Sequence, residues 1–245
     1  MAGGTLLVRR TWQTAQVSAA RPETADARTI RLRFPEPVTG TAGQHVDLRL
    51  TAEDGYQAVR SYSVAAWVPP YELEVTVEEL DDGEVSPFLV GVLAVGDDLE
   101  VRGPVGGWFT WTPDNGGPLQ LIAGGSGVVP LMAMLRSHSE SRSAVPARLL
   151  YSVRSPASMF YGGELAVIGQ ENSQVRLDIA YSREAPEGAT AGRLTHEAVT
   201  ASCFPPEDAP AIYICGSTGF VEAVSSWLVE DGHEPARIRT ERYGG

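Results

Sequence analysis

Three short motifs in this chain combine residue types that bind a planar, phosphorylated ligand. Arg60-Ser61-Tyr62-Ser63 offers a cation, an aromatic face and a hydroxyl within four residues. Gly83-Glu84-Val85-Ser86 puts small backbone and a capping serine at the start of an expected helix, where an anion binds. A glycine-rich turn, residues 123–130, opens the second half of the chain. The first two motifs together predict a site for a flavin that carries a pyrophosphate.

Each motif has a plainer interpretation when it stands alone. An arginine beside an alternating strand explains residues 60–63, because a strand places successive side chains on opposite faces. An ordinary strand-to-helix turn explains the glycines, which do not match the dinucleotide fingerprint G-x-G-x-x-G, since Gly125-Ser126-Gly127-Val128-Val129 ends at Pro130. The order of the three motifs favours the ligand-binding interpretation.

The first part of the chain has the pattern of an antiparallel β-barrel. Short alternating runs at residues 29–34, 45–50 and 71–77 are separated by Pro, Gly and Asp turns. One helix is expected at residues 86–95, with Ser86 as N-cap and Pro87 at its first position. Residues 112–118 are rich in Pro, Gly and Asn and are expected to form a linker. We place a barrel domain at residues 1–114 and a second domain at residues 115–245.

The second part alternates between apolar strands and helices. Strands are expected at residues 119–123, 147–153, 175–180 and 211–215, and helices near residues 129–137, 163–170, 196–200 and 219–230. This alternation predicts an α/β doubly wound parallel sheet, whose ligands bind at the carboxyl ends of the strands. Gly124, Arg154, Ser182 and Gly216 each follow an expected strand, so they should face one crevice.

Composition excludes several classes of partner and site. The net charge of −12 argues against nucleic acid and against anionic membranes. Cys203 and Cys215 are the only cysteines, too few for a disulfide framework or for a cysteine-ligated iron–sulfur cluster. Any cluster must therefore belong to a partner. The four histidines (His45, His138, His196 and His233) lack metal-ligand spacing and are expected to be ordinary surface or turn residues, so no metal site is predicted.

Charge and hydropathy are unevenly distributed along the chain. Six arginines against two acidic residues give residues 1–33 a net charge of +4, which leaves −16 for the rest. This basic front is either a solvated strand surface or a docking surface. The apolar runs are too short to span a bilayer, and no signal-peptide core follows Met1. We therefore expect a soluble, cytoplasmic protein.

These motifs resemble the ferredoxin–NADP reductase superfamily, from about Trp12 to the C-terminus. The resemblance implies that Arg60 pairs with the flavin pyrophosphate, that Tyr62 lies against the isoalloxazine ring, and that Ser63 hydrogen-bonds the flavin N5. It also implies FAD rather than FMN, because residues 82–87 have the Asp-Gly-x-x-Ser-Pro form of FAD-binding relatives. Further cofactor contacts are expected at Ser61, Val77, Gly83, Val85 and Ser86.

The same resemblance implies a pyridine nucleotide in the second domain. The family pattern G-G-x-G-x-x-P is matched by residues 124–130, and it assigns Gly124, Gly125, Ser126, Gly127 and Pro130 to the nucleotide pyrophosphate. Arg154, Ser182-Arg183 and Arg193 look like the set that binds the 2′-phosphate of NADP, which calls for planar, always-charged donors. The alternative is that arginines simply recur after strands in a chain without lysine.

The C-terminal region also resembles the family. The Cys215-Gly216 pair implies a thiol beside the nicotinamide, although a buried cysteine is more often apolar filler. Residues 217–220, Ser-Thr-Gly-Phe, depart from the proline and methionine that relatives usually show. Glu241 and Tyr243 resemble the plant-type Glu-x-Tyr ending, in which the tyrosine covers the flavin and the glutamate supports the serine and the cysteine. A frayed tail is the alternative.

The resemblance therefore implies an enzyme in which NADPH passes hydride to FAD, with Ser63, Cys215, Glu241 and Tyr243 as the catalytic residues. Reduced FAD would pass single electrons to a separate carrier such as ferredoxin or flavodoxin, for which the basic front would be the dock. The alternatives are the reductase component of an oxygenase or haem system, a free flavin reductase, and a non-catalytic flavin electron-transfer subunit.

Overall fold

The computed structural model describes residues 11–243. Arg9 and Arg10 of the expected basic front, and the two terminal glycines, lie outside the described residues. The chain forms two compact units: unit 1 contains Met1–Pro22 and Asp26–Thr110, and unit 2 contains Glu23–Ala25 and Trp111–Gly245. Our boundary between residues 114 and 115 stays a prediction. Among the described residues, no helix is both long and apolar enough to cross a membrane.

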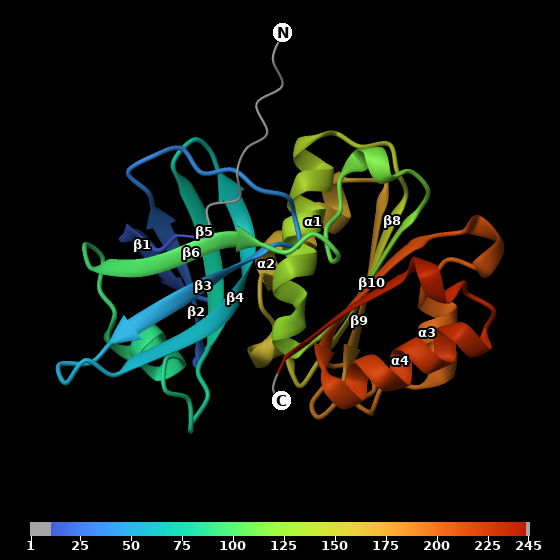
Figure 1. Cartoon of the computed structure of the whole chain (residues 1–245). Coiled ribbons are helices and arrows are strands. Elements are labelled where there is room, and N and C mark those ends of the chain that lie inside the picture. Colours follow the sequence, from blue (N-terminus) through green and yellow to red (C-terminus); the bar gives the residue numbers. More distant parts are fainter. Residues whose placement is uncertain (1–10, 244–245) are drawn as a thin grey trace, which may run out of the picture. The chain divides into compact units, whose positions relative to one another are not determined.

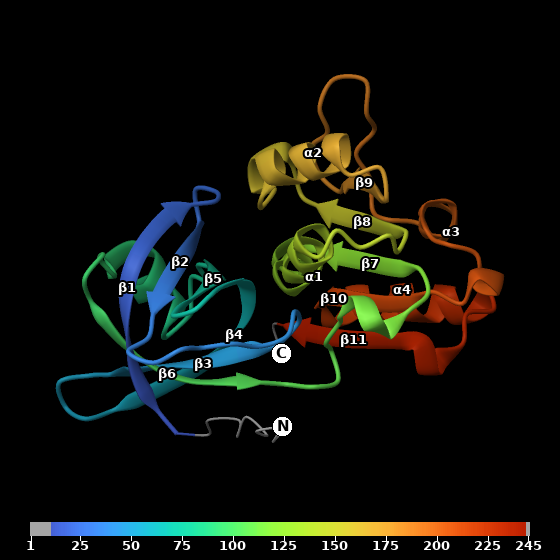
Figure 2. The ribbon, with the colours of Figure 1, turned by 90° about the horizontal axis from the view of Figure 1, so that it is seen from above.

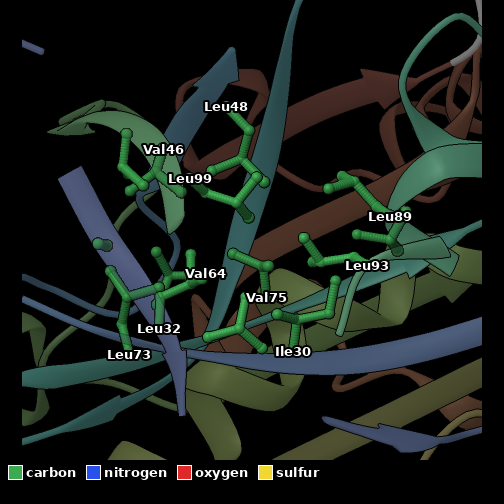
Figure 3. Packing of buried hydrophobic residues seen from close by; sticks show 14 of the residues in the cluster. Ile30, Leu32, Val46, Leu48, Val64, Leu73, Val75, Leu89, Leu93 and Leu99 are labelled. Atoms are coloured by element: carbon green, nitrogen blue, oxygen red, sulfur yellow. The ribbon is translucent and has the colours of Figure 1, made fainter. Parts of the chain in front are cut away.

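Unit 1 is a closed barrel of six antiparallel strands, as the alternating pattern predicts (Figure 1). The strand order around the barrel is β1-β2-β5-β4-β3-β6. The strands are β1 (Gln13–Pro22), β2 (Ala27–Arg33), β3 (His45–Thr51), β4 (Gln57–Val68), β5 (Glu72–Glu78) and β6 (Asp98–Val105). Their alternate apolar residues point inward and are removed from water, which is the main favourable term in folding. Figure 3 shows side chains from β2 to β5 packing in one cluster with Leu89 and Leu93.

The helix expected at residues 86–95 begins at Ser86 as expected but ends three residues early, at Val92. A π-helical segment spans Phe88–Val92, and Leu93 already has an extended backbone. Arg28 accounts for this early end, because its guanidinium donates to the carbonyl oxygen of Leu93 at 2.6 Å and holds it out of the helix. The side chain of Ser86 does not cap the helix as expected. Its Oγ instead accepts a hydrogen bond from the backbone N–H of Leu80 at 3.1 Å.

Unit 2 is a doubly wound α/β unit with a five-stranded parallel sheet in the order β11-β10-β7-β8-β9 (Figure 2). Helices α1 and α2 lie on one side of the sheet and α3 and α4 on the other (Figure 1). The strands are β7 (Leu119–Gly124), β8 (Ala147–Val153), β9 (Val175–Tyr181), β10 (Ala211–Ser217) and β11 (Ile238–Tyr243). The helices are α1 (Val128–Glu140), α2 (Gly162–Glu171), α3 (His196–Ser202) and α4 (Thr218–Glu230).

Strand β11 was not expected, and a frayed tail is the wrong description of the chain up to Tyr243. The strand pairs in parallel with β10 from Ile212–Ile238 to Ser217–Tyr243. Sequence analysis missed it because Arg239, Glu241 and Arg242 interrupt the apolar run that marks a buried parallel strand. As an edge strand, β11 leaves one side open and tolerates these charges.

The expected basic front is largely neutralised in the structure. Arg21 and Arg31 both bind the carboxylate of Glu74, at 3.0 and 2.7 Å, and Glu74 is only 3% exposed. Arg33 binds Glu72 at 2.8 Å. These acidic residues sit on β5, which pairs with β2 in the barrel. The described part of the front is therefore a paired strand surface rather than an open cationic dock.

Candidate functional site

Strand β4 carries the Arg60-Ser61-Tyr62-Ser63 motif and presents its side chains to different surroundings. Tyr62 is half-buried against the barrel core, and burial raises the pKa of its phenol to about 12. Ser63 is half-buried and pairs with His45 of β3. Its hydroxyl has no hydrogen-bond partner among residues 11–243, so it is available to a ligand. β4 thus carries, at successive positions, an aromatic ring and a hydroxyl that has no partner among the described residues.

Ser61 is engaged by a buried carboxylate that sequence analysis missed. Its Oγ donates to Asp47 at 2.6 Å, and Arg102 donates to the same carboxylate at 2.6 and 3.0 Å. Burial alone would raise the pKa of Asp47, but the hydrogen bonds from Ser61 and Arg102 hold that pKa below its ordinary value. Asp47 therefore acts as a fixed anion that ties β3, β4 and β6 together. The sequence signal for this buried carboxylate was a single aspartate within an apolar alternating strand.

Arg60 is paired on the surface of unit 1. Its guanidinium donates to one oxygen of Glu84 and to the carbonyl oxygen of Val59. The hydroxyl of Tyr56 donates to the other oxygen of Glu84 at 2.8 Å. Both partners of the ion pair are about half exposed, so the pair is screened by solvent and is weakly stabilising. A ligand phosphate can compete for Arg60 in this arrangement.

The loop around Gly83 is tightly built. A Cβ at Gly83 would lie 2.5 Å from Ser86 Oγ and 2.9 Å from the carbonyl oxygen of Leu80, so only glycine fits. The side chains of Val77 and Val85 are fully buried in the barrel core. Any contact of these two valines with a cofactor would therefore come from their backbone. The cofactor roles expected for Gly83, Val85, Ser86 and Val77 stay predictions.

The glycine loop of unit 2 is packed at the carboxyl edge of the sheet. Gly124 ends β7, residues Gly125–Gly127 form a 3-10 turn, and α1 begins at Val128. A Cβ at Gly127 would lie 2.3 Å from the backbone oxygen of Cys215. Gly125 has a φ of +55°, which favours glycine. Pro130 sits in the first turn of α1, where a missing N–H costs nothing.

An aromatic side chain that sequence analysis did not select shapes this loop. The ring of Phe220, in the first turn of α4, would be 2.9 Å from a Cβ at Gly124 and 2.7 Å from one at Gly216. The two glycines lie on adjacent strands, β7 and β10. They are therefore the residues that leave room for the phenyl ring. The sequence signal that could have identified Phe220 was the departure of residues 217–220 from the family pattern.

Three predicted residues of the C-terminal half meet at the ends of β10 and β11. Cys215 pairs with Glu241 in the parallel register. Burial raises the pKa of the Cys215 thiol well above its ordinary value, and the charge of Glu241 adds to this, so the thiol stays protonated. Burial also raises the pKa of Glu241 to about 7, and its Oε2 is buried without a hydrogen-bond partner among the described residues. The hydroxyl of Tyr243 donates to the carbonyl oxygen of Gly124 at 2.6 Å.

The predicted phosphate-binding arginines lie at the same edge of the sheet. Arg154 follows β8, and its carbonyl oxygen accepts the backbone N–H of Arg183 at 2.9 Å. The segment before Arg193 is tied to β9 by a bond from Gly192 N–H to the Tyr181 carbonyl oxygen at 2.8 Å. All three arginines are exposed, and none has an ion pair within residues 11–243. The adjacent Ser182 is half-buried directly after β9.

The histidines differ from the sequence expectation. His138 is fully buried on α1, with Nε2 2.7 Å from the carbonyl oxygen of Val145, and His233 is also buried. "Surface or turn" was therefore wrong for His138, which lies inside α1. His233 is buried but lies in the turn after α4, where its backbone N–H donates to the carbonyl oxygen of Leu228. Across residues 11–243, no group of three or more His, Cys, Asp or Glu side chains is arranged to hold a metal ion.

Both units match known families along most of their length. Residues 14–110 match the family described as "Oxidoreductase FAD-binding domain", and residues 121–226 match "Oxidoreductase NAD-binding domain". The fold resembles that of a ferredoxin NADP+ reductase from Neisseria gonorrhoeae, with a TM-score of 0.80, 21% identity and coverage of 94% of this chain and 98% of that one.

The chain belongs to the ferredoxin–NADP reductase superfamily. It contains the FAD-binding and the NAD(P)-binding domain of that superfamily. Two of its relatives are the reductase component of propane 2-monooxygenase from Mycolicibacterium smegmatis and a glycine betaine monooxygenase reductase subunit from Chromohalobacter salexigens. They are 33% and 31% identical over 87% and 91% of this chain.

This chain spans 62% of the length of the propane 2-monooxygenase reductase component and 61% of the length of the glycine betaine monooxygenase reductase subunit. Among solved structures, the cytochrome P450 reductase GcoB from Amycolatopsis is 29% identical, with a TM-score of 0.82 over 95% of this chain and 69% of that one. The FAD- and NAD-binding part of a nitric oxide dioxygenase from Vibrio cholerae has a TM-score of 0.85 at 24% identity, covering 95% of this chain and 99% of that one.

Proposed function

We propose that this protein is an FAD-containing oxidoreductase that takes hydride from NADPH and passes electrons to a separate carrier such as ferredoxin or flavodoxin. The observation that carries the proposal is a close-packed glycine loop that shares one sheet edge with three exposed arginines, which form no ion pair within residues 11–243. Such an edge suits a ligand with several phosphates, because the N-terminus of α1 adds a positive dipole end. The family matches support both nucleotide-binding domains.

The residues of unit 1 fit a bound flavin. Tyr62 offers a ring fixed by packing, and Arg60 offers a surface guanidinium for a diphosphate. Ser63 offers a hydroxyl that has no hydrogen-bond partner in the described part of the chain. FAD supplies the chemistry when bound, since it accepts two electrons together and releases them singly. The protein's part is to hold the ring and orient the reactive nitrogen through Ser63.

The residues of unit 2 fit the nicotinamide end of the donor. Cys215 is buried near the end of β10, and burial raises the pKa of its thiol well above its ordinary value, so the group stays neutral. Burial raises the pKa of Glu241 to about 7, so its carboxyl is protonated in part of the molecules at neutral pH. Tyr243 is held over the glycine loop through Gly124. We assign these three residues to positioning the nicotinamide and to keeping water away from it.

We further propose a preference for NADPH over NADH. The 2′-phosphate distinguishes the two nucleotides, and guanidinium groups bind phosphate with paired, charge-assisted hydrogen bonds. Arg154, Arg183 and Arg193 have no competing carboxylate among the described residues, so they are free to bind that phosphate. Their backbone links at the carboxyl edge support a joint role.

A second candidate function is the reductase component of an oxygenase or haem system. The relatives favour it, since they are reductases of monooxygenases and of a cytochrome P450. The 245 residues contain two cysteines, fewer than an iron–sulfur cluster needs. We therefore assign any cluster in the electron path to a carrier separate from these residues.

Anaerobic titration of the purified, FAD-loaded protein with NADPH and with NADH tests the proposal. We expect NADPH to bleach the flavin absorbance at lower concentration than NADH. Ferredoxin, flavodoxin or an oxygenase component added next, with cytochrome c as reporter, separates the two candidate functions. Turnover of free flavin without any carrier would instead indicate a flavin reductase. Failure of both nucleotides to bleach the flavin would contradict the proposal and support a non-catalytic flavin subunit.

A further inference from the structure

The acidic loop before the π-helical segment places one carboxylate against the flavin-binding arginine. Residues 78–84 contain five acidic side chains, and of these only Glu84 forms an ion pair within residues 11–243. Its two oxygens are both used: Arg60 donates to Oε2 and Tyr56 donates to Oε1 at 2.8 Å. The loop is thereby tied to β4 through Arg60 and to the residue just before β4 through Tyr56.

The contact keeps Glu84 charged. The hydrogen bond from Tyr56, followed by that from Arg60, lowers the pKa of the Glu84 carboxyl below its ordinary value. At neutral pH a full negative charge therefore lies against the guanidinium that the proposed function assigns to a diphosphate. A guanidinium has five N–H donors in one plane, but Arg60 already gives one to Val59 and one to Glu84. Each of its two terminal nitrogens therefore already has one acceptor, and a phosphate that binds both nitrogens must share them with or displace that acceptor.

We propose that Glu84 competes with the flavin diphosphate for Arg60, so that this chain binds FAD more weakly than the Arg60 site alone would allow. The inference rests on the proposed function, because it takes the diphosphate of FAD as the ligand of Arg60. Diphosphate binding breaks the Arg60–Glu84 contact or adds a like charge beside it, and either costs binding free energy. When FAD leaves, Glu84 takes Arg60 back. The pair therefore favours exchange of the flavin.

Equilibrium titration of the flavin-free full chain tests this, with flavin fluorescence as the readout. FAD, FMN and riboflavin are compared, since only FAD has a diphosphate and riboflavin has no phosphate. For Glu84→Gln we expect the Kd of FAD to fall about two- to fivefold, the range that an exposed ion pair is worth. The Kd of riboflavin should not change. Asp82→Asn makes the same charge change in the same loop, at a residue with no ion pair within residues 11–243, and should have a smaller effect on FAD.

A double-mutant cycle with Arg60→Ala tests whether Glu84 acts through Arg60 or through a general effect on the loop. In the Arg60→Ala background, Glu84→Gln should no longer tighten FAD binding. An unchanged or raised Kd for FAD in Glu84→Gln, or equal tightening of FAD and riboflavin, would overturn the inference. The proposed function would survive either result as long as NADPH bleaches the bound FAD. Absence of FAD binding in the unmodified protein would contradict both.

Discussion

The hydroxyl of Tyr243 donates a hydrogen bond of 2.6 Å to the carbonyl oxygen of Gly124. This bond joins the end of β11 to the end of β7, with β10 lying between the two strands in the sheet. It also explains part of the glycine requirement, because a Cβ at Gly125 would lie 2.8 Å from the same hydroxyl. Tyr243 thus helps to fix the loop assigned to the nucleotide. A role in covering the flavin stays a prediction.

The Tyr243→Phe variant should lose this bond while keeping the ring. We expect the free energy of unfolding of unit 2 to fall by about 0.5–1.5 kcal/mol, the usual net value of one hydrogen bond. Urea unfolding followed by fluorescence measures it. Tyr71→Phe is the control, because Tyr71 is exposed and its hydroxyl has no partner in the described part of the chain. Equal effects of the two variants would contradict the assignment.

The Gly127→Ala variant should damage the glycine loop through its Cβ alone. Gly127 has a φ of −61°, which alanine adopts freely, but the added atom would lie 2.3 Å from the oxygen of Cys215. We expect a loss of about 1–3 kcal/mol in stability and weaker NADPH binding. Thermal unfolding and nucleotide titration measure these.

Gly163→Ala is the matched control for that loop variant. No atom lies within 4 Å of a Cβ at Gly163, which is in α2. Alanine there should leave NADPH binding unchanged and leave stability equal or slightly higher. A Gly127→Ala protein that binds NADPH normally would show that the loop is not the nucleotide site.

The Arg183→Ala variant should reduce the preference for NADPH. A charge-assisted hydrogen bond is worth about 1.5–3 kcal/mol, so we expect kcat/KM for NADPH to fall roughly ten- to a hundred-fold. The value for NADH, which lacks the 2′-phosphate, should change little. Arg176→Ala on β9 is the control, since Arg176 is paired with Asp178 at 3.0 Å. An unchanged NADPH to NADH ratio in Arg183→Ala would contradict our assignment.

Glu241 should make stability depend on pH. Burial raises the pKa of its carboxyl from 4.5 to about 7, so between these values the folded protein holds more protons than the unfolded chain. Stability contributed by this group is therefore greatest below pH 4.5 and is lost as pH rises toward 7. The difference is at most about 3 kcal/mol. Relative to wild type, Glu241→Gln should gain stability as pH rises from 5 to 8.

Denaturant unfolding at pH 5 and pH 8 measures the Glu241 effect. Glu222→Gln is the control, because Glu222 is exposed on α4 and its replacement by glutamine removes one charge from the same unit. Its stability relative to wild type should stay constant across this range. A constant difference for Glu241→Gln as well would mean that the carboxyl is ionised in both states.

Elements with one clear periodicity could be predicted from the sequence. The expected strand at residues 147–153 matches β8 residue for residue, and the barrel runs fall within one or two residues of β2, β3 and β5. Elements governed by contacts distant in sequence could not. Arg28 ends the π-helical segment from β2, and β11 forms only because β10 offers an edge for pairing.

In the candidate site, too, local motifs could be found in the sequence and contacts between distant residues could not. Short motifs identified Arg60 to Ser63 and the glycine loop, because those sites depend on local backbone and side-chain order. The motifs did not reveal that Glu84 binds Arg60, that Asp47 binds Ser61, or that Phe220 packs on two glycines. Each of these contacts joins residues 4 to 96 positions apart that only the fold brings together.

The double pairing of Glu74 with Arg21 and Arg31 affects how other molecules approach the barrel. Together with Arg33 and Glu72, three guanidinium groups and two carboxylates leave a single net positive charge on that surface. A field this weak is screened within about 8 Å at physiological ionic strength. Encounters with an acidic protein at that surface should therefore proceed at a rate that added salt barely changes, and fast, salt-sensitive association would have to involve another face of the molecule.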